Sequence, residues 1–116
     1  MFERLFGGAG NGIPSANPRD AWARLSTESK STTLIDVREG WEFSRGRAKG
    51  AKNIPLSALS KRVGEIPRDR DVYIICQSGN RSMQAARFLR QQGIERVFNV
   101  MGGTTVWQMH GLPVER

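Results

Sequence analysis

The sequence has very few of the residues that build disulfide frameworks and metal clusters. Its 116 residues include one cysteine, Cys76, and one histidine, His110. A single cysteine excludes an internal disulfide and is typical of proteins from a reducing compartment. One cysteine and one histidine cannot supply the ligands of a zinc site or an iron–sulfur cluster of the usual spacing, so we expect no metal.

Long apolar segments are missing as well. No stretch approaches the length that crosses a bilayer, and the first eight residues lack the basic and apolar regions of a secretory signal. We therefore expect a cytoplasmic protein that binds no membrane. The length fits one domain, which we assign to residues 13–116, with the glycine-rich residues 1–12 as a flexible lead-in.

Acidic residues are outnumbered by basic ones, 11 to 18, which gives a net charge of +7. The cations are spread over the chain, and their densest group contains no acid and no interleaved aromatic residue that could stack on a base: Arg45, Arg47, Lys49 and Lys52. We therefore expect an anionic small molecule or an acidic protein as a partner, and no nucleic acid. A solvated surface explains the same four residues equally well.

Strand-like and helix-like segments alternate along the chain. Three apolar, mostly β-branched runs predict buried strands, and Pro55 predicts a short edge strand because it cannot donate to a ladder. The predicted strands are Thr33–Val37, Asn53–Leu56, Val72–Ile75 and Val97–Val100. Helices are expected after an Asn17 cap, after a Ser57 cap, over Ser82–Gln92 up to Gly93, and over Thr104–His110. This alternation predicts an α/β fold with a mainly parallel sheet.

We assign structural and not catalytic roles to two of the tryptophans and to the histidine. We expect Trp22 and Trp107 in the core, and His110 at the surface or at a helix end. Residues 38–53 form a long, mostly irregular segment in which Trp41–Phe43 is compatible with one helical turn.

Cys76 ends one predicted strand and opens a polar loop that leads into a helix. Ligands bind at the carboxyl ends of parallel strands, and a helix N-terminus favours a thiolate over a thiol. Gly79 permits a tight loop whose N–H groups turn inward, and Arg81 offers a planar fork of donors. A small buried apolar residue in an ordinary turn is the alternative, but the combination favours a nucleophile.

The loop length separates two chemistries. Cysteine-dependent phosphatases use a Cys-x5-Arg loop that seats a tetrahedral phosphoryl group. Here Cys76 and Arg81 are separated by four residues, and the smaller loop fits a single sulfur atom better.

Several ordered motifs resemble the single-domain rhodaneses, a family of sulfurtransferases, over about residues 13–115. The matching segments are Leu34–Arg38, Glu42–Phe43, Gly50–Ala51, Asn53–Leu56, Cys76–Ser82, Gly102–Gly103, Trp107 and Gly111–Pro113. The resemblance implies a doubly wound sheet of about five strands. It also implies that Cys76 takes a sulfane sulfur from thiosulfate, a persulfide or a polysulfide and passes it to a thiol or cyanide, with no cofactor.

The same resemblance implies the roles of the surrounding residues. Arg81 joins Cys76 as a catalytic residue that binds the anionic part of the donor. The substrate-binding residues are Gln77, Ser78, Gly79, Asn80, Arg81 and Ser82, of which Gln77 to Arg81 hold the persulfide charge with their amides. Three residues support the loop: Asp36 accepts hydrogen bonds from the loop backbone, and Arg38 pairs with Glu42.

Two segments depart from the family pattern. The family often has Gly-His-Ile-Pro-Gly-Ala where this chain has Gly46–Ala51, so two cations replace a histidine and a proline. We expect catalysis to survive, and the basic segment from Arg45 to Lys52 to attract an anionic donor or an acidic or thiol-bearing acceptor protein. Thr104 and Thr105 stand where a small residue is common, which we expect to affect only packing.

Two other functions fit the sequence less well. One is a sulfur-carrier or binding module of the same family with little turnover of its own, although the retained Cys76 favours an enzyme. The other is a small phosphatase or arsenate reductase, which the short loop and the missing second cysteine disfavour. No apolar stripe is left unexplained, so we expect a monomer.

Overall fold

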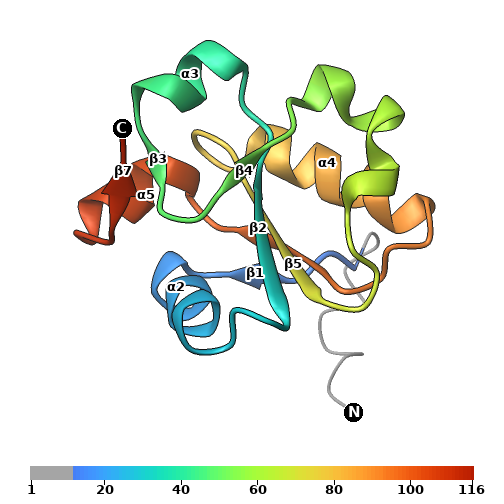
Figure 1. The fold of residues 1–116 in the computed structure, drawn as a ribbon, viewed down its shortest axis with the longest axis horizontal. Helices are drawn as coiled ribbons and strands as arrows, with labels where there is room; N and C mark the ends of the chain where they lie inside the picture. The colour runs from blue at the N-terminus through green and yellow to red at the C-terminus, as the bar shows by residue number, and fades with distance from the viewer. Residues whose placement is uncertain (1–11) are drawn as a thin grey trace.

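The computed structural model describes residues 12–116, so the predicted lead-in lies outside the described residues apart from Gly12. A five-stranded sheet forms the centre, with strand order β1-β6-β5-β2-β4 and every pairing parallel (Figure 1). Its strands are β1 (Ser15–Ala16), β2 (Thr32–Asp36), β4 (Lys52–Asn53), β5 (Asp71–Ile75) and β6 (Val97–Val100). The predicted α/β fold with a five-stranded parallel sheet is confirmed.

Helices cover both faces of this sheet (Figure 1). They are α2 (Pro18–Thr27), α3 (Gly40–Arg45), α4 (Asn80–Gln91) and α5 (Gly103–Met109), with two 3-10 helices, η1 (Leu56–Lys61) and η2 (Val63–Glu65). Helices α2 and α5 lie on one face, and α4 and η1 on the other. None of the helices in residues 12–116 has the length and apolar character needed to cross a bilayer.

The alternation of side chains along β5 divides the core into two layers. Val72, Ile74 and Cys76 belong to the cluster under α4, whereas Tyr73 and Ile75 belong to the cluster under α2 and α5. The thiol therefore lies on the α4 side of the sheet, at the carboxyl end of a central strand. Trp107 is fully buried in the second cluster, as predicted, with Trp22 packed edge-on at 6.0 Å between ring centroids.

Most predicted elements agree with the structure. Asn17 caps α2 by accepting a hydrogen bond from the amide of Asp20 at 2.9 Å, and Gly93 follows α4 with φ +89°. The predicted helical turn at Trp41–Phe43 lies within α3, and Trp41 is 62% exposed. His110 follows the last residue of α5, a helix end as expected.

Helix α5 begins and ends one residue earlier than predicted, at Gly103 and Met109, and two other helix starts differ by more. Ser57 is not a cap, because η1 already begins at Leu56, directly after Pro55. Pro55 occupies the N-cap position, still with extended backbone (φ −56°, ψ 146°), so Ser57 already lies inside the first turn. Helix α4 begins at Asn80 instead of Ser82, because the left-handed Gly79 lets the chain turn into the helix earlier.

Three very short strands were not predicted. They are β1 in the main sheet and an antiparallel pair outside it, β3 (Arg47–Ala48) with β7 (Val114–Glu115). Two residues carry no readable periodicity, so only tertiary contacts identify such strands. The β3–β7 pair joins the C-terminal residues to the basic segment.

Candidate active site

Cys76 lies directly after β5 and before the helix α4, where the sequence predicts a nucleophile. The residue is 1% exposed. Its sulfur lies 3.1 Å from the amide nitrogen of Gly79, and 3.3 Å from both the amide nitrogen and the hydroxyl oxygen of Ser82. The loop therefore wraps its polar groups around the sulfur atom.

These contacts favour the ionised form of the thiol. Burial raises the pKa of Cys76, but hydrogen bonds from the Ser82 hydroxyl and from the amides of Ser82, Gly79 and Ser78 together outweigh it, and the pKa lies below its ordinary value. Among the described residues no cation donates a hydrogen bond to the sulfur, so hydrogen bonds from the loop are the largest cause of the lowered pKa, and Arg81 interacts with the sulfur only through its charge.

The N-terminus of α5 clamps the loop from the other side. Thr104 donates from its amide and its hydroxyl to the carbonyl oxygen of Cys76, at 2.8 and 2.9 Å, and the Thr105 amide donates to the carbonyl of Gln77 at 3.1 Å. The Thr104 hydroxyl therefore does more than the predicted packing. Gly103 allows the approach, because a Cβ there would lie 2.5 Å from the Cys76 carbonyl oxygen.

Arg81 does not point an open fork of donors at the sulfur. Its guanidinium binds both carboxylate oxygens of Glu42 in α3, at 2.7 and 2.9 Å. The predicted pair of Arg38 and Glu42 is therefore wrong. The hydrogen bonds from Arg81 lower the pKa of Glu42 to about 2, so this carboxylate is ionised throughout the physiological range.

Asp36 supports the loop indirectly, not through the loop amides as predicted. Within residues 12–116, its fully buried carboxylate accepts hydrogen bonds only from the backbone and guanidinium of Arg38. Arg38 then donates to the side chain of Gln77 at 3.2 Å and to the carbonyl of Gly46 at 2.8 Å. The short Asp-Val-Arg spacing lets Arg38 fold back on Asp36, which leaves the carboxylate saturated.

Asn99 is a site residue that the sequence analysis missed. It lies in β6, is 5% exposed, and its Oδ1 accepts a hydrogen bond from the Ser82 hydroxyl at 2.5 Å. Its Nδ2 lies 3.5 Å from the carbonyl oxygen of Gly79. One signal was available: an amide at the inward position of a buried strand, two residues after Val97, needs a polar partner.

The other loop residues have different positions. The Gln77 side chain donates to the Thr105 hydroxyl at 2.9 Å, while Ser78 and Asn80 are exposed.

A cleft of about 400 Å³ borders the loop at Gln77 and Thr104. Trp41 and Arg45 form part of its wall, with the Arg45 guanidinium 5.1 Å from the centre of the Trp41 ring.

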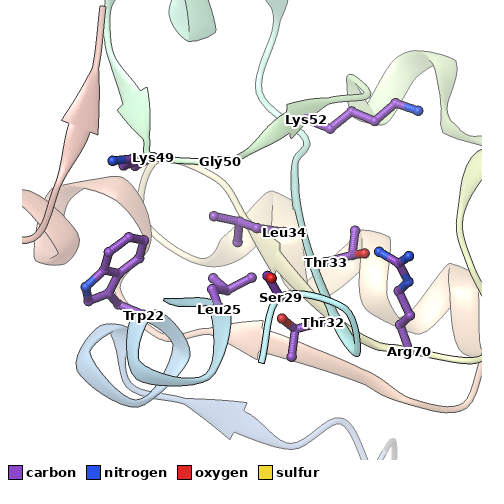
Figure 2. Close-up of a pocket in the computed structure, with 10 residues that line it drawn as sticks. All are labelled: Trp22, Leu25, Ser29, Thr32, Thr33, Leu34, Lys49, Gly50, Lys52 and Arg70. Carbon is purple, nitrogen blue, oxygen red and sulfur yellow. The ribbon is translucent and has the colours of Figure 1, made fainter. Parts of the chain in front are cut away.

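The four cations of the basic segment do not lie together in the structure. Arg45 lines the cleft beside the loop, and Arg47 stacks on Phe43 at 4.8 Å. Lys49 and Lys52 line a second cleft of about 370 Å³ between α2 and β2, shown in Figure 2. Arg70, beside Thr33, adds a third cation to the lining, and the apolar lining residues are Trp22, Leu25 and Leu34.

Comparison with known proteins agrees with this geometry. The family profile for the rhodanese-like domain matches residues 17–110. A sulfurtransferase from Allochromatium vinosum is 42% identical over 87 residues, which are 75% of this chain and 81% of the relative. The thiosulfate sulfurtransferase GlpE of Actinobacillus pleuropneumoniae is 31% identical over 85% of this chain and 90% of its own length.

Two further relatives differ in kind. The putative sulfur carrier protein YrkF of Bacillus subtilis is 36% identical over 76% of this chain, which spans about half, 48%, of that protein. The crystal structure of a rhodanese-related protein from Thermoplasma volcanium superposes with a TM-score of 0.80 at 35% identity, covering 89% of this chain and 98% of that one. The chain therefore belongs to the family of rhodanese-like domains.

Proposed function

We propose that this chain is a sulfurtransferase that carries a sulfane sulfur as a persulfide on Cys76. The observation that carries the proposal is the set of three polar contacts around the only sulfur nucleophile in the chain, within 3.3 Å. A thiolate held in this way is ready to attack an electrophilic sulfur atom.

The first step loads the enzyme. The Cys76 thiolate attacks the outer sulfur of thiosulfate or of a persulfide or polysulfide donor. The bond from Sγ to that sulfur forms as the S–S bond of the donor breaks, and the leaving sulfite or thiolate departs with the electron pair. No oxidant is needed, because the donor already holds sulfur in the sulfane state.

The second step unloads it. An acceptor thiolate or cyanide attacks the outer sulfur, and the Cys76 thiolate leaves with the electron pair of the broken S–S bond. The amides of Gln77 to Arg81 are proposed to hold the negative charge on the outer sulfur between the two steps. The loop already directs the amide of Gly79 at Sγ, which supports this role.

Arg81 is proposed to assist by attracting an anionic donor, and its pairing with Glu42 limits that role. The pair is neutral as a whole, so the guanidinium offers a donor anion less charge than a free arginine would. Arg38 lines the adjoining cleft but is paired with Asp36, so the further positive charge there comes from Arg45. We therefore place the anionic end of the donor at this cleft.

A sulfur-carrier role without rapid turnover is the second candidate. The near-complete burial of Cys76 and the similarity to YrkF favour it. In that case a loaded Cys76 would wait for a protein partner before it released its sulfur. A phosphatase is less well supported, since the loop is short and Arg81 is occupied by Glu42.

Mass measurement of the intact protein tests the proposal. After incubation with thiosulfate, or with a small persulfide or polysulfide donor, the wild-type chain should gain one sulfur atom, and Cys76→Ser should gain none. Cyanide should then remove the sulfur as thiocyanate. Loading followed by slow release to cyanide and small thiols supports the carrier. Phosphate release from an aryl phosphate without any sulfur adduct would overturn both.

A further inference from the structure

The hydroxyl of Ser82 lies between two groups that can accept its proton. Its oxygen is 2.5 Å from Oδ1 of Asn99 and 3.3 Å from Sγ of Cys76. Ser82 is fully buried, and Asn99 is 5% exposed. A hydroxyl carries a single proton, so at any moment Ser82 donates to one of these two acceptors.

The protonation state of Cys76 decides between the acceptors. When the sulfur carries a proton, S–H donates to the Ser82 oxygen, and the hydroxyl donates to Asn99. When the sulfur is a thiolate, a lone pair of the Ser82 oxygen would face a negative charge, so the hydroxyl turns toward the sulfur. Oδ1 of Asn99 is then a buried acceptor without its donor, and the free-energy cost of that loss opposes the rotation of the hydroxyl.

We propose that Asn99 is a positioning residue that competes with the sulfur of Cys76 for the proton of Ser82, so that the hydroxyl turns to Sγ only while Sγ is charged. The inference rests on the proposed function for its place in the cycle. The free thiolate accepts the hydrogen bond of the Ser82 hydroxyl. Once the persulfide forms, the charge moves to the outer sulfur, Sγ becomes neutral, and the hydroxyl returns to Asn99.

The fold holds Asn99 in the orientation that this competition needs. Strand β6 directs residues 97 and 99 to the α4 face, beneath the first turn of that helix. The contact of Nδ2 with the carbonyl of Gly79, at 3.5 Å, directs Oδ1 toward Ser82. Because Gly79 also donates its amide to Sγ, the same residue anchors both acceptors.

The charged groups near the loop come from other elements and form two pairs of their own. Arg81 of α4 is bound to Glu42 of α3, and Asp36 at the end of β2 is bound to Arg38. Neither pair contacts Asn99 among the described residues. Substitutions at Asn99 therefore change the proton competition without removing an ion pair.

Titration of the thiolate by its ultraviolet absorption tests the inference on the full chain, with Cys76→Ser as the baseline. Asn99→Leu removes the rival acceptor at similar size and should lower the pKa of Cys76, whereas Asn99→Asp binds the proton more tightly, adds negative charge and should raise it. We expect shifts of about half a pH unit or more. Ser82→Ala should raise the pKa and should abolish the effect of Asn99→Leu in the double variant.

Thr32→Val is the matched control, because its buried hydroxyl donates to the carbonyl of Glu28 at the other end of β2, away from the loop of Cys76. It should leave the thiol pKa nearly unchanged. Shifts of the same sign from both Asn99 variants, or an Asn99→Leu shift that persists without the Ser82 hydroxyl, would overturn the inference. Circular dichroism checks the fold of each variant, and if Asn99→Leu does not fold, Asn99→Asp with and without Ser82→Ala decides.

The titration needs no sulfur donor, so it separates this inference from the proposed function. Opposite shifts without any sulfur adduct would leave the competition standing and remove the sulfurtransferase. A sulfur adduct without these pKa shifts would support the sulfurtransferase and overturn the competition for the Ser82 proton.

Discussion

At the scale of single residues, the site depends on side chains that hold one another in place. Cys76 and the loop that surrounds it follow from the sequence, since strand, glycine-containing loop and helix are all readable there. The partners of Asp36, Arg38, Glu42 and Arg81 do not follow, because charge and proximity in sequence leave several pairings equally good. Only the positions of α3 and α4 in space bring Glu42 to Arg81 and leave Arg38 to Asp36.

The pair of Arg81 and Glu42 predicts a dependence of stability on pH. Its carboxylate has a pKa of about 2 in the folded chain, against an ordinary value of 4.5. A carboxylate whose pKa is lowered by folding stabilises the fold fully above the unfolded pKa, and this contribution is lost as pH falls through the folded one. Wild type should therefore lose this contribution between about pH 4.5 and 2.

Glu42→Gln measures the effect, because glutamine can keep the hydrogen bond from the Glu39 amide while losing the charge. The variant should be less stable by about 1 kcal/mol at neutral pH, since solvent partly screens Arg81. Denaturant unfolding at several pH values should show the difference shrinking toward pH 2. A difference that stays constant with pH would contradict an ionic origin.

At the scale of the elements, the long segments could be predicted, whereas among the two-residue strands only the edge strand β4 was expected, at Asn53–Leu56 instead of Lys52–Asn53. Val97–Val100 and the helix before Gly93 carry enough apolar periodicity and end signals to be recognised. Strands β1, β3, β4 and β7 have two residues each, so their pairing is set by the neighbours that they meet. The role of α5 also escaped prediction, because Gly102 and Gly103 read as a turn and not as a contact with the loop of Cys76.

Gly103→Ala tests the clamp that α5 places on this loop. A Cβ at this position would lie 2.5 Å from the Cys76 carbonyl oxygen and 2.6 Å from the backbone of Gln77, so the loop or the helix must shift. The free energy of unfolding should fall by about 1–3 kcal/mol more than in the control, and sulfur loading should be lost or slowed.

Gly111→Ala is the control, because it carries the same backbone strain without the clash. Its φ of +69° is close to the +61° of Gly103, yet nothing lies within 4 Å of a Cβ there. Thermal or denaturant unfolding and the mass of the loaded protein compare the two variants. Equal losses of stability and of sulfur loading in the two variants would show that the strained left-handed backbone causes them, and not the contact of residue 103 with the loop.

At the scale of the whole molecule, the fold distributes the basic segment between two clefts. The sequence alone treats Arg45, Arg47, Lys49 and Lys52 as one basic segment. The turn between β3 and β4 separates them, and only Arg45 lines the cleft that borders the loop of Cys76. An acidic acceptor that docks for sulfur transfer should therefore depend more on Arg45 than on Lys49.

Charge reversal tests this dependence with two cysteine peptides as acceptors, one flanked by glutamates and one by glycines. Arg45→Glu should slow sulfur transfer to the acidic peptide about tenfold relative to the neutral one, and added salt should reduce the difference. Lys61→Glu, at the end of η1, is the control and should not discriminate between the peptides. Equal slowing of both peptides by Arg45→Glu would place Arg45 in the chemistry instead of the docking.

The shortness of β4 has a consequence for how copies of the chain meet. Strand β4 pairs with Ile35 and Asp36, so within residues 12–116 the first part of β2 has no strand beside it on that edge. Unpaired edges invite sheet-to-sheet aggregation, and natural proteins oppose it with cations along the edge. Lys49, Lys52 and Arg70 line the cleft at this opening. Lys52 is paired with Glu65 at 3.0 Å, so two copies approaching edge to edge would bring mainly the charges of Lys49 and Arg70 together. We therefore expect the cations that line the second cleft to oppose self-association through this edge.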